Sequence, residues 1–74
     1  MSGEYFVTAE LRNWTYDVDN NIYWGNIYND LYRRWKDGTT IVTSKVLSRL
    51  EFENSFIIIT AHNVYRCYKS TRRQ

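Results

Sequence analysis

The sequence contains no proline, only three glycines and a single cysteine, and each scarcity excludes a class of protein. Linkers and disordered segments usually carry proline, and 43% of the 74 residues are hydrophobic, so we expect a folded chain. Cys67 has no second cysteine to pair with, which excludes an internal disulfide and a cysteine-based structural metal site. A chain of this length holds one domain, over residues 1–74.

Long apolar runs are also absent. The longest covers residues 56–59, far short of the roughly 20 residues that cross a bilayer as a helix. The first residues show no basic segment followed by an apolar one, so we expect no secretory signal. These features predict a soluble cytoplasmic protein without a membrane partner.

Aromatic residues are abundant for so short a chain, with three Trp, seven Tyr and three Phe. Below roughly 70–80 residues a single core rarely contributes more than about 3–5 kcal/mol without a disulfide or a metal. Large aromatic side chains increase what a small core buries, and Tyr and Trp are also enriched at protein interfaces. We therefore predict a homo-oligomer, most simply a dimer.

Apolar and polar residues alternate in several short segments, which is the period of half-buried strands. The unbroken apolar run at 56–59 is typical of a strand buried on both faces. Five strands are predicted, at residues 4–16, 22–28, 39–46 (or, bent, as far as 52), 55–60 and 64–68. The fold class is therefore all-β, as a small five-stranded SH3-like or OB-like barrel or a bent antiparallel sheet.

Several residues predict irregularities within this pattern. The alternation changes phase near Asn13, which favours a β-bulge there, and Gly25 inside a strand indicates a bulge, a bend or a close backbone approach. Residues 17–21 are rich in Asx residues and predict a turn. Residues 29–36 fit either an irregular loop or one short helical turn, and the basic segment 69–74 fits a flexible tail.

Catalytic residue types are few. His62 is expected in an exposed hairpin turn, and Cys67 in a strand, where a free cysteine behaves as a small hydrophobic residue. Asp17 and Asp19 lie in a turn that lacks the glycine and final glutamate of a calcium-binding loop. The isolated glycines do not form a phosphate-binding loop. We predict a protein that is not an enzyme and holds neither cofactor nor metal.

Two groups of residues are candidates for a binding site. Guanidinium groups, hydroxyls and turn amides are the groups that hold phosphates and carboxylates, and aromatic rings stack on bases or anchor protein interfaces. The alternative is a hairpin turn with solvated charges and aromatic residues that belong to the core. The first group is the run 33–40, with Arg33, Arg34, Trp35, Lys36 and Asp37, followed by Thr43, Ser44 and Lys45. The second is the aromatic series Trp14, Tyr16, Tyr23, Trp24, Tyr28, Tyr32 and Trp35.

Residues 13–14, 24–30, 34–46, 60 and 63–65 form a distinctive pattern. It consists of a Gly-x-Ile/Val-Tyr turn, an aromatic-Asp-Gly-Thr-x-Ile/Val-x-Thr-Ser segment, and a small residue followed by Val-Tyr. In this pattern the chain resembles a group of small uncharacterised phage proteins. Lys36, inserted between Trp35 and Asp37, and a longer basic tail depart from that pattern.

The resemblance implies a non-enzymatic host-takeover or anti-defence factor. One mechanism sequesters a nucleotide second messenger, with Arg33, Arg34 and Lys45 on its phosphates, Thr43 and Ser44 donating hydroxyls, and Trp24 or Trp35 stacking on a base. A second mechanism occludes a host protein through the aromatic residues. The alternative is a small-barrel nucleic-acid-binding module, although a net charge of +2 is weak support for duplex DNA binding.

Overall fold

The computed structural model describes residues 6–73, which form one six-stranded mixed sheet in the order β3-β2-β1-β6-β5-β4. A single turn of 3-10 helix, η1 (Lys69–Thr71), follows the last strand. The strands are β1 (Ala9–Asp17), β2 (Ile22–Tyr28), β3 (Thr39–Val42), β4 (Ser48–Glu51), β5 (Ser55–Ile59) and β6 (Val64–Tyr68).

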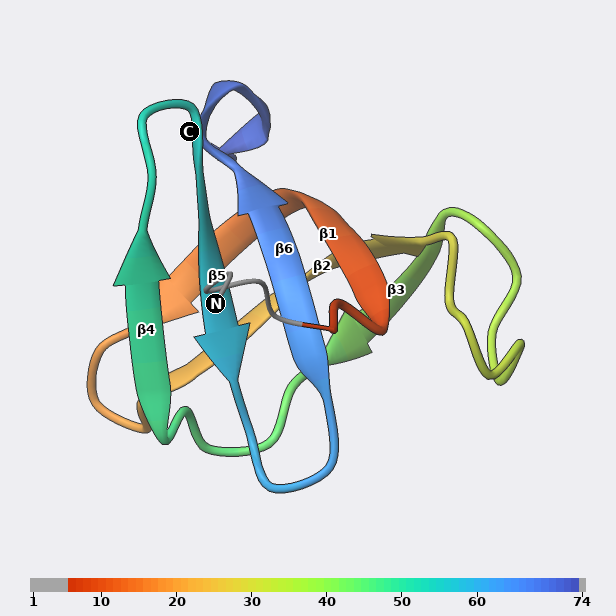
Figure 1. Ribbon diagram of the computed structural model, residues 1–74, viewed down its shortest axis with the longest axis horizontal. Coiled ribbons are helices and arrows are strands. Elements are labelled where there is room, and N and C mark those ends of the chain that lie inside the picture. The colour runs from red at the N-terminus through yellow and green to blue at the C-terminus, as the bar shows by residue number, and fades with distance from the viewer. Residues whose placement is uncertain (1–5, 74) are drawn as a thin grey trace.

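The sheet is strongly bent into two layers, with β1, β2 and β3 behind β4, β5 and β6 (Figure 1). β1 connects the layers because it pairs antiparallel with β2 and parallel with β6. Aromatic side chains meet across the bend. The ring of Phe56 lies 4.9 Å from that of Trp14 in an edge-to-face contact and 5.7 Å from that of Tyr23. Such contacts add to the stability that area burial alone supplies.

The core lies between these layers. Its residues alternate along each strand, since successive side chains of a strand point to opposite faces. The described core cluster contains Ala9, Leu11, Trp14, Tyr23, Ile27, Ile41, Phe56, Ile58, Tyr65 and Cys67.

β1 carries the irregularity predicted from its sequence. The pairing register with β2 shifts between Arg12 and Thr15, and Asn13 has a positive φ of 51°, so the bulge is confirmed. Gly25 lies against this bulge. A Cβ there would lie 2.7 Å from the carbonyl oxygen of Arg12 and 2.9 Å from the Cα of Trp14, so the close approach is also confirmed. The bulge turns Trp14 into the core.

The all-β prediction is confirmed, but its details need correction. Six strands replace the predicted five, the sheet is open and not a closed barrel, and the β1–β6 pair makes it mixed and not antiparallel. The predicted strand at 39–46 ends at Val42, because residues 43–47 leave β3 at one edge of the sheet and cross to β4 at the other. Of the predicted strand 4–16, residues 6–8 are not strand, and residues 4 and 5 lie outside the described part.

The helical turn considered near 30–36 is absent from the structure. Leu31 and Trp35, which would share a helical face, are both exposed, and Asn29 and Arg33 have positive φ values that a helix does not allow. The segment 29–37 is therefore a loop. Throughout residues 6–73, no helix has the length and apolar character needed to cross a bilayer.

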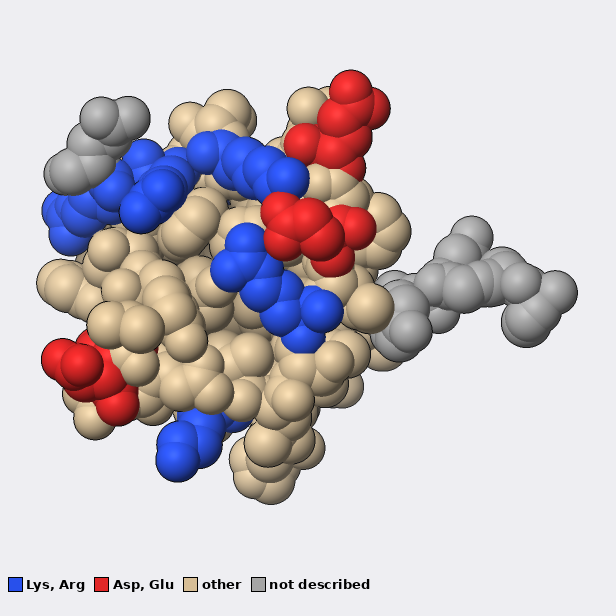
Figure 2. Space-filling model, turned by 90° about the vertical axis from the view of Figure 1, so that its left-hand side faces the viewer, with Lys and Arg blue, Asp and Glu red and all other residues tan. Residues whose placement is uncertain are grey.

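The basic C-terminal segment has more contacts than a flexible tail would have. Arg72 forms a parallel bridge with Trp14, and the amide of Arg73 donates to the Trp14 carbonyl oxygen at 2.8 Å. Lys69 pairs with Glu51 of β4 at 2.7 Å. Seen from the β4 side, Lys and Arg side chains form a band across the upper part of the molecule, beside a group of acidic side chains (Figure 2).

Candidate functional site

The predicted anion-binding residues fall into two separate places. Arg33, Arg34 and Trp35 belong to the 29–37 loop, which precedes β3, whereas Thr43, Ser44 and Lys45 follow β3 at its other end. The loop projects from one side of the molecule and residues 43–47 run along its lower edge (Figure 1). Four strand residues separate the two places, roughly 13 Å of extended chain. The structure therefore does not join them into one pocket.

The hydroxyl of Thr43 is used within the fold. It accepts a hydrogen bond from the Tyr23 amide at 3.1 Å and donates to the Ser44 carbonyl oxygen at 2.9 Å. The residue is buried, whereas Ser44 and Lys45 are exposed. Thr43 consequently holds the end of β3 in place and does not present its hydroxyl to solvent.

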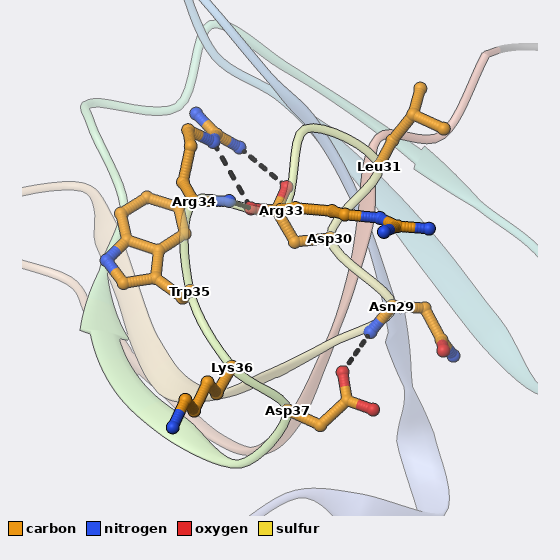
Figure 3. A pocket seen from close by; sticks show the side chains of 8 residues that line it. All are labelled: Asn29, Asp30, Leu31, Arg33, Arg34, Trp35, Lys36 and Asp37. Atoms are coloured by element: carbon orange, nitrogen blue, oxygen red, sulfur yellow. Dashed lines mark hydrogen bonds and ion pairs between the residues drawn. The ribbon is translucent and has the colours of Figure 1, made fainter.

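Arg34 is likewise engaged with other residues of the chain (Figure 3). Its Nε and Nη2 donate to the two carboxylate oxygens of Asp30, at 3.3 and 3.0 Å, and Nη2 also donates to the Asn63 side-chain oxygen at 2.7 Å. The guanidinium lies 4.5 Å from the Trp35 ring centroid and 5.2 Å from that of Tyr32. Arg34 therefore joins the loop to the β5–β6 turn and holds both rings.

Three of the loop amides donate to the protein's own carboxylates. Asp30 accepts from the amides of Arg34 at 2.7 Å and Tyr32 at 3.4 Å, and Asp37 accepts from the amide of Asn29 at 2.8 Å. An anion held by these three amides would have to displace Asp30 or Asp37.

Burial opposes ionisation of Asp30, but the hydrogen bonds from the Arg34 side chain and from the Arg34 and Tyr32 amides outweigh it and hold its pKa below the usual value. The side chain of Asp30 is almost fully buried, so the loop has a charged anchor at its base. Asp37 belongs to the candidate run 33–40, whereas Asp30 and Asn63 were not identified as site residues from the sequence. The Asp-x-x-x-Arg spacing is a visible signal for Asp30, which pairs with Arg34 four residues later.

The loop offers both aromatic and charged side chains to solvent. Leu31 is 50% exposed, Tyr32 55% and Trp35 36%, and the charged Arg33 and Lys36 are exposed beside them. The loop surrounds an open hollow of about 800 Å³. The arrangement is a fixed backbone that presents large side chains outward.

The outward face of β2 forms a second exposed surface. Trp24, predicted as a stacking residue, is 40% exposed there, and the Arg73 guanidinium lies 5.9 Å from its ring centroid. Tyr28 lies four residues further along the strand, and the Arg12 guanidinium lies 4.3 Å from its ring centroid. Between the two rings, Asn26 donates to Thr40 at 3.0 Å. Trp24 pairs with Val42 and therefore lies beside the 43–45 segment with which it was predicted to act, but the Thr43 side chain of that segment is buried.

The residues with nucleophilic or metal-binding chemistry do not assemble. Cys67 is fully buried, and burial raises the pKa of its thiol to about 12, so the thiol stays protonated at neutral pH. His62 is exposed in the β5–β6 turn. The described part of the chain contains no group of three His, Cys, Asp or Glu residues close enough to hold a metal ion.

Comparison with family models, with curated proteins and with solved structures gives no match for this chain. The function therefore has to be argued from the geometry of the two exposed surfaces.

Proposed function

We propose that the protein is a non-enzymatic binding protein that docks onto a partner protein through the 29–37 loop. The observation that carries the proposal is that some side chains of this loop fix its backbone while others are exposed. The side chains of Asp30, Arg34 and Asp37 are bonded within the fold, while Leu31, Tyr32 and Trp35 remain exposed beside Arg33 and Lys36. Such a loop presents aromatic and basic side chains together, a combination that is common at protein interfaces.

The residue types support a protein partner. Trp, Tyr and Arg are the residues that most often dominate binding free energy at protein interfaces, and here Tyr32, Arg33 and Trp35 lie within four positions. Arg34 stacks against the two rings and restricts them. A loop already fixed by the Asp30 and Asp37 bonds loses little conformational entropy on binding, and that increases affinity.

Sequestration of a nucleotide is less well supported by these contacts. Of the groups proposed to hold it, the Thr43 hydroxyl and the Arg34 guanidinium are bonded internally, and three of the loop amides donate to carboxylates. Arg33, Ser44 and Lys45 are exposed but are divided between the two ends of β3. A nucleotide would meet separate charges and no shared pocket within this chain.

The resemblance to small phage proteins extends the proposal. On that basis the partner is a host protein that the chain occludes, as a host-takeover or anti-defence factor in the host cytoplasm. The expected homo-oligomer belongs to the same proposal, because a second copy would present a second loop. Light scattering at micromolar concentration tests the oligomer, and a monomer mass would remove that part.

The test of the docking loop is a comparative capture from host lysate. The tagged protein, a Leu31→Ser, Tyr32→Ser variant and a Phe52→Ser control are immobilised in equal amounts, Phe52 being an exposed aromatic residue in the β4–β5 connection. We expect one protein captured in near-stoichiometric amount by the wild type and the control, and lost from the loop variant. Equal capture by all three, or no capture at all, would count against the loop.

Calorimetric titration distinguishes the nucleotide alternative. A panel of cyclic di- and trinucleotides and cyclic ADP-ribose isomers is titrated into the wild-type protein and into a Lys45→Ala variant. The docking proposal expects no heat from any member. Saturable heat that Lys45→Ala weakens would favour sequestration of a nucleotide.

A further inference from the structure

The outward face of β1, β2 and β3 carries two rings, each paired with an arginine. Trp24 and Tyr28 lie on the same side of β2, since they are four residues apart, and roughly 13 Å of strand separates them. Arg73 lies by the Trp24 ring and Arg12 by the Tyr28 ring. Hydrogen-bonding side chains fill the space between the rings, with Asn26 bonded to Asn13 and to Thr40.

This face carries two arginines, Arg12 and Arg73, together with the carboxylates of Glu10 and Asp17. Arg73 reaches it from the C-terminal segment, which is fixed to the β1 bulge by the bridge between Arg72 and Trp14 and by the Arg73 amide. Arg73 forms no ion pair within the described residues, whereas Arg12 pairs with Glu10. The carboxylate of Asp17, at the far end of β1, accepts from the amides of Asp19 and Asn20 in the turn.

We infer that this face binds single-stranded nucleic acid. Its bases would stack on Trp24 and on the Arg12 guanidinium above Tyr28, while Arg73 contacts a phosphate. Every base has a flat aromatic face, so rings and guanidinium planes on an open sheet bind strands with little sequence preference. The site is distinct from the 29–37 loop and does not depend on the docking function proposed for that loop.

Unpaired bases fit this face better than a duplex does. Stacking on Trp24 requires a base that is free of its partner strand, and the rings lie on a sheet face and not on an element that could enter a groove. The number of free arginines is also small for a duplex binder, which usually has a broad basic surface. The polyanion expected here is therefore a short single strand.

The test is fluorescence anisotropy with a labelled oligothymidine of about 12 nucleotides, within the range that one small β domain covers. The salt concentration is varied between about 50 and 200 mM. With Arg73 on a phosphate, log K should fall against log salt with a slope of about −0.7, because a single strand loses about 0.7 per phosphate contact.

The variants separate the roles of ring and charge. Arg73→Ala should make the slope shallower by about 0.7. Trp24→Ala should weaken binding about tenfold and leave the slope unchanged, since stacking releases no counterions. Lys45→Ala, an exposed base beyond the end of β3, and Tyr32→Ser in the loop should both bind like the wild type. Circular dichroism checks that each variant is folded.

Three results would overturn the inference. The first is no anisotropy change at about 50 mM salt, where charge contacts are strongest. The second is equal flattening of the slope by Lys45→Ala and Arg73→Ala, which would show unspecific charge attraction. The third is a duplex of the same length that competes as strongly as the single strand. If the protein still captured a protein partner while giving any of these results, the docking function of the 29–37 loop would be supported and nucleic-acid binding would not.

Discussion

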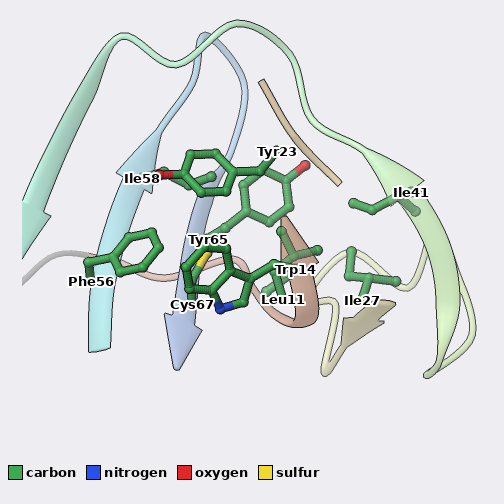
Figure 4. Close-up of a cluster of buried hydrophobic side chains, with 10 residues drawn as sticks. Leu11, Trp14, Tyr23, Ile27, Ile41, Phe56, Ile58, Tyr65 and Cys67 are labelled. Carbon is green, nitrogen blue, oxygen red and sulfur yellow. The ribbon is translucent and has the colours of Figure 1, made fainter. Parts of the chain in front are cut away.

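Different forces stabilise the aromatic core, which lies between the two layers, and the 29–37 loop. In the first, Trp14, Tyr23 and Phe56 pack ring against ring with almost no exposure (Figure 4). In the second, Asp30 and Arg34 bond the loop while its large side chains stay in solvent (Figure 3). The comparison shows that some aromatic rings of this sequence stabilise the core while others are exposed on the loop. Polar bonds, not apolar packing, hold the loop that carries the exposed rings.

The largest effect is expected from the core. Phe56→Ala removes a ring that contacts both Trp14 and Tyr23 and leaves a cavity, so we expect a loss of about 4 kcal/mol in the free energy of unfolding. Urea denaturation followed by Trp fluorescence measures it. Phe52→Ala, at an exposed ring, is the control and should cost less than about 1 kcal/mol. Similar losses for Phe56→Ala and Phe52→Ala would contradict the distinction between stabilising core rings and exposed rings.

The next effect is expected at Gly25, where the β1 bulge meets β2. A methyl group there would overlap the backbone of Arg12 and Trp14, which a side-chain rotation cannot relieve, so Gly25→Ala should cost about 3 kcal/mol. Gly38→Ala is the matched control. A Cβ there would meet only the Tyr28 hydroxyl, at an ordinary contact distance of 3.7 Å, but the φ of Gly38 is 91°, and this strain should cost about 1 kcal/mol. The same urea titration ranks the two, and a larger loss at Gly38 would contradict the close approach.

Local patterns of the sequence were enough for several strands. The predicted segments at 22–28 and 64–68 coincide with β2 and β6, and the phase change at Asn13 located the bulge. Alternation shows which face of a strand a residue occupies, so much of the core could be predicted. It does not show which strand lies alongside, and the parallel β1–β6 pair brings together residues more than 50 positions apart.

The candidate site was harder to predict for the same reason. Arg34 looked free for a ligand because its partner Asn63 lies 29 residues away, in another turn. The hydroxyl of Thr43 is bonded to the amide of Tyr23, 20 residues earlier. Partners so far away in the sequence are not visible until the fold is known. Exposed Leu31 gives no signal in the sequence, and the candidate aromatic series that includes Tyr32 could not be divided into buried and exposed rings, since the same residues in a strand would be buried.

A smaller effect is expected where the loop depends on charge. Asp30→Asn keeps the shape of the side chain but loses the charge-assisted bonds to Arg34 and to the loop amides, so we expect a loss of about 2 kcal/mol. Asp19→Asn, in the exposed turn, is the control. Urea titration gives the loss in the free energy of unfolding. Hydrogen exchange of the Tyr32 and Arg34 amides shows whether the loop is the part that is destabilised. Unchanged protection of both amides would contradict the role of Asp30.

The same pair gives a pH dependence with a definite sign. The pKa of Asp30 is lower in the folded chain than its usual value, so its contribution is present above about pH 4 and is lost as the pH falls through the folded value. The stability difference between wild type and Asp30→Asn should therefore be constant from neutral pH to about pH 5 and shrink below about pH 4. A difference that grew on acidification would contradict the ion pair.

The smallest effect is expected from the side chains that the loop presents. Leu31→Ser with Tyr32→Ser changes more apolar surface than Phe52→Ala, yet both side chains are about half exposed and lie outside the core cluster. We expect the free energy of unfolding to change by no more than about 0.5 kcal/mol, because exposed substitutions that break no buried contact rarely do more. If this variant instead lost as much unfolding free energy as Asp30→Asn, Leu31 and Tyr32 would stabilise the loop and would not simply be exposed on it. A stable variant that no longer captures a partner would show that these side chains contribute to binding and not to folding.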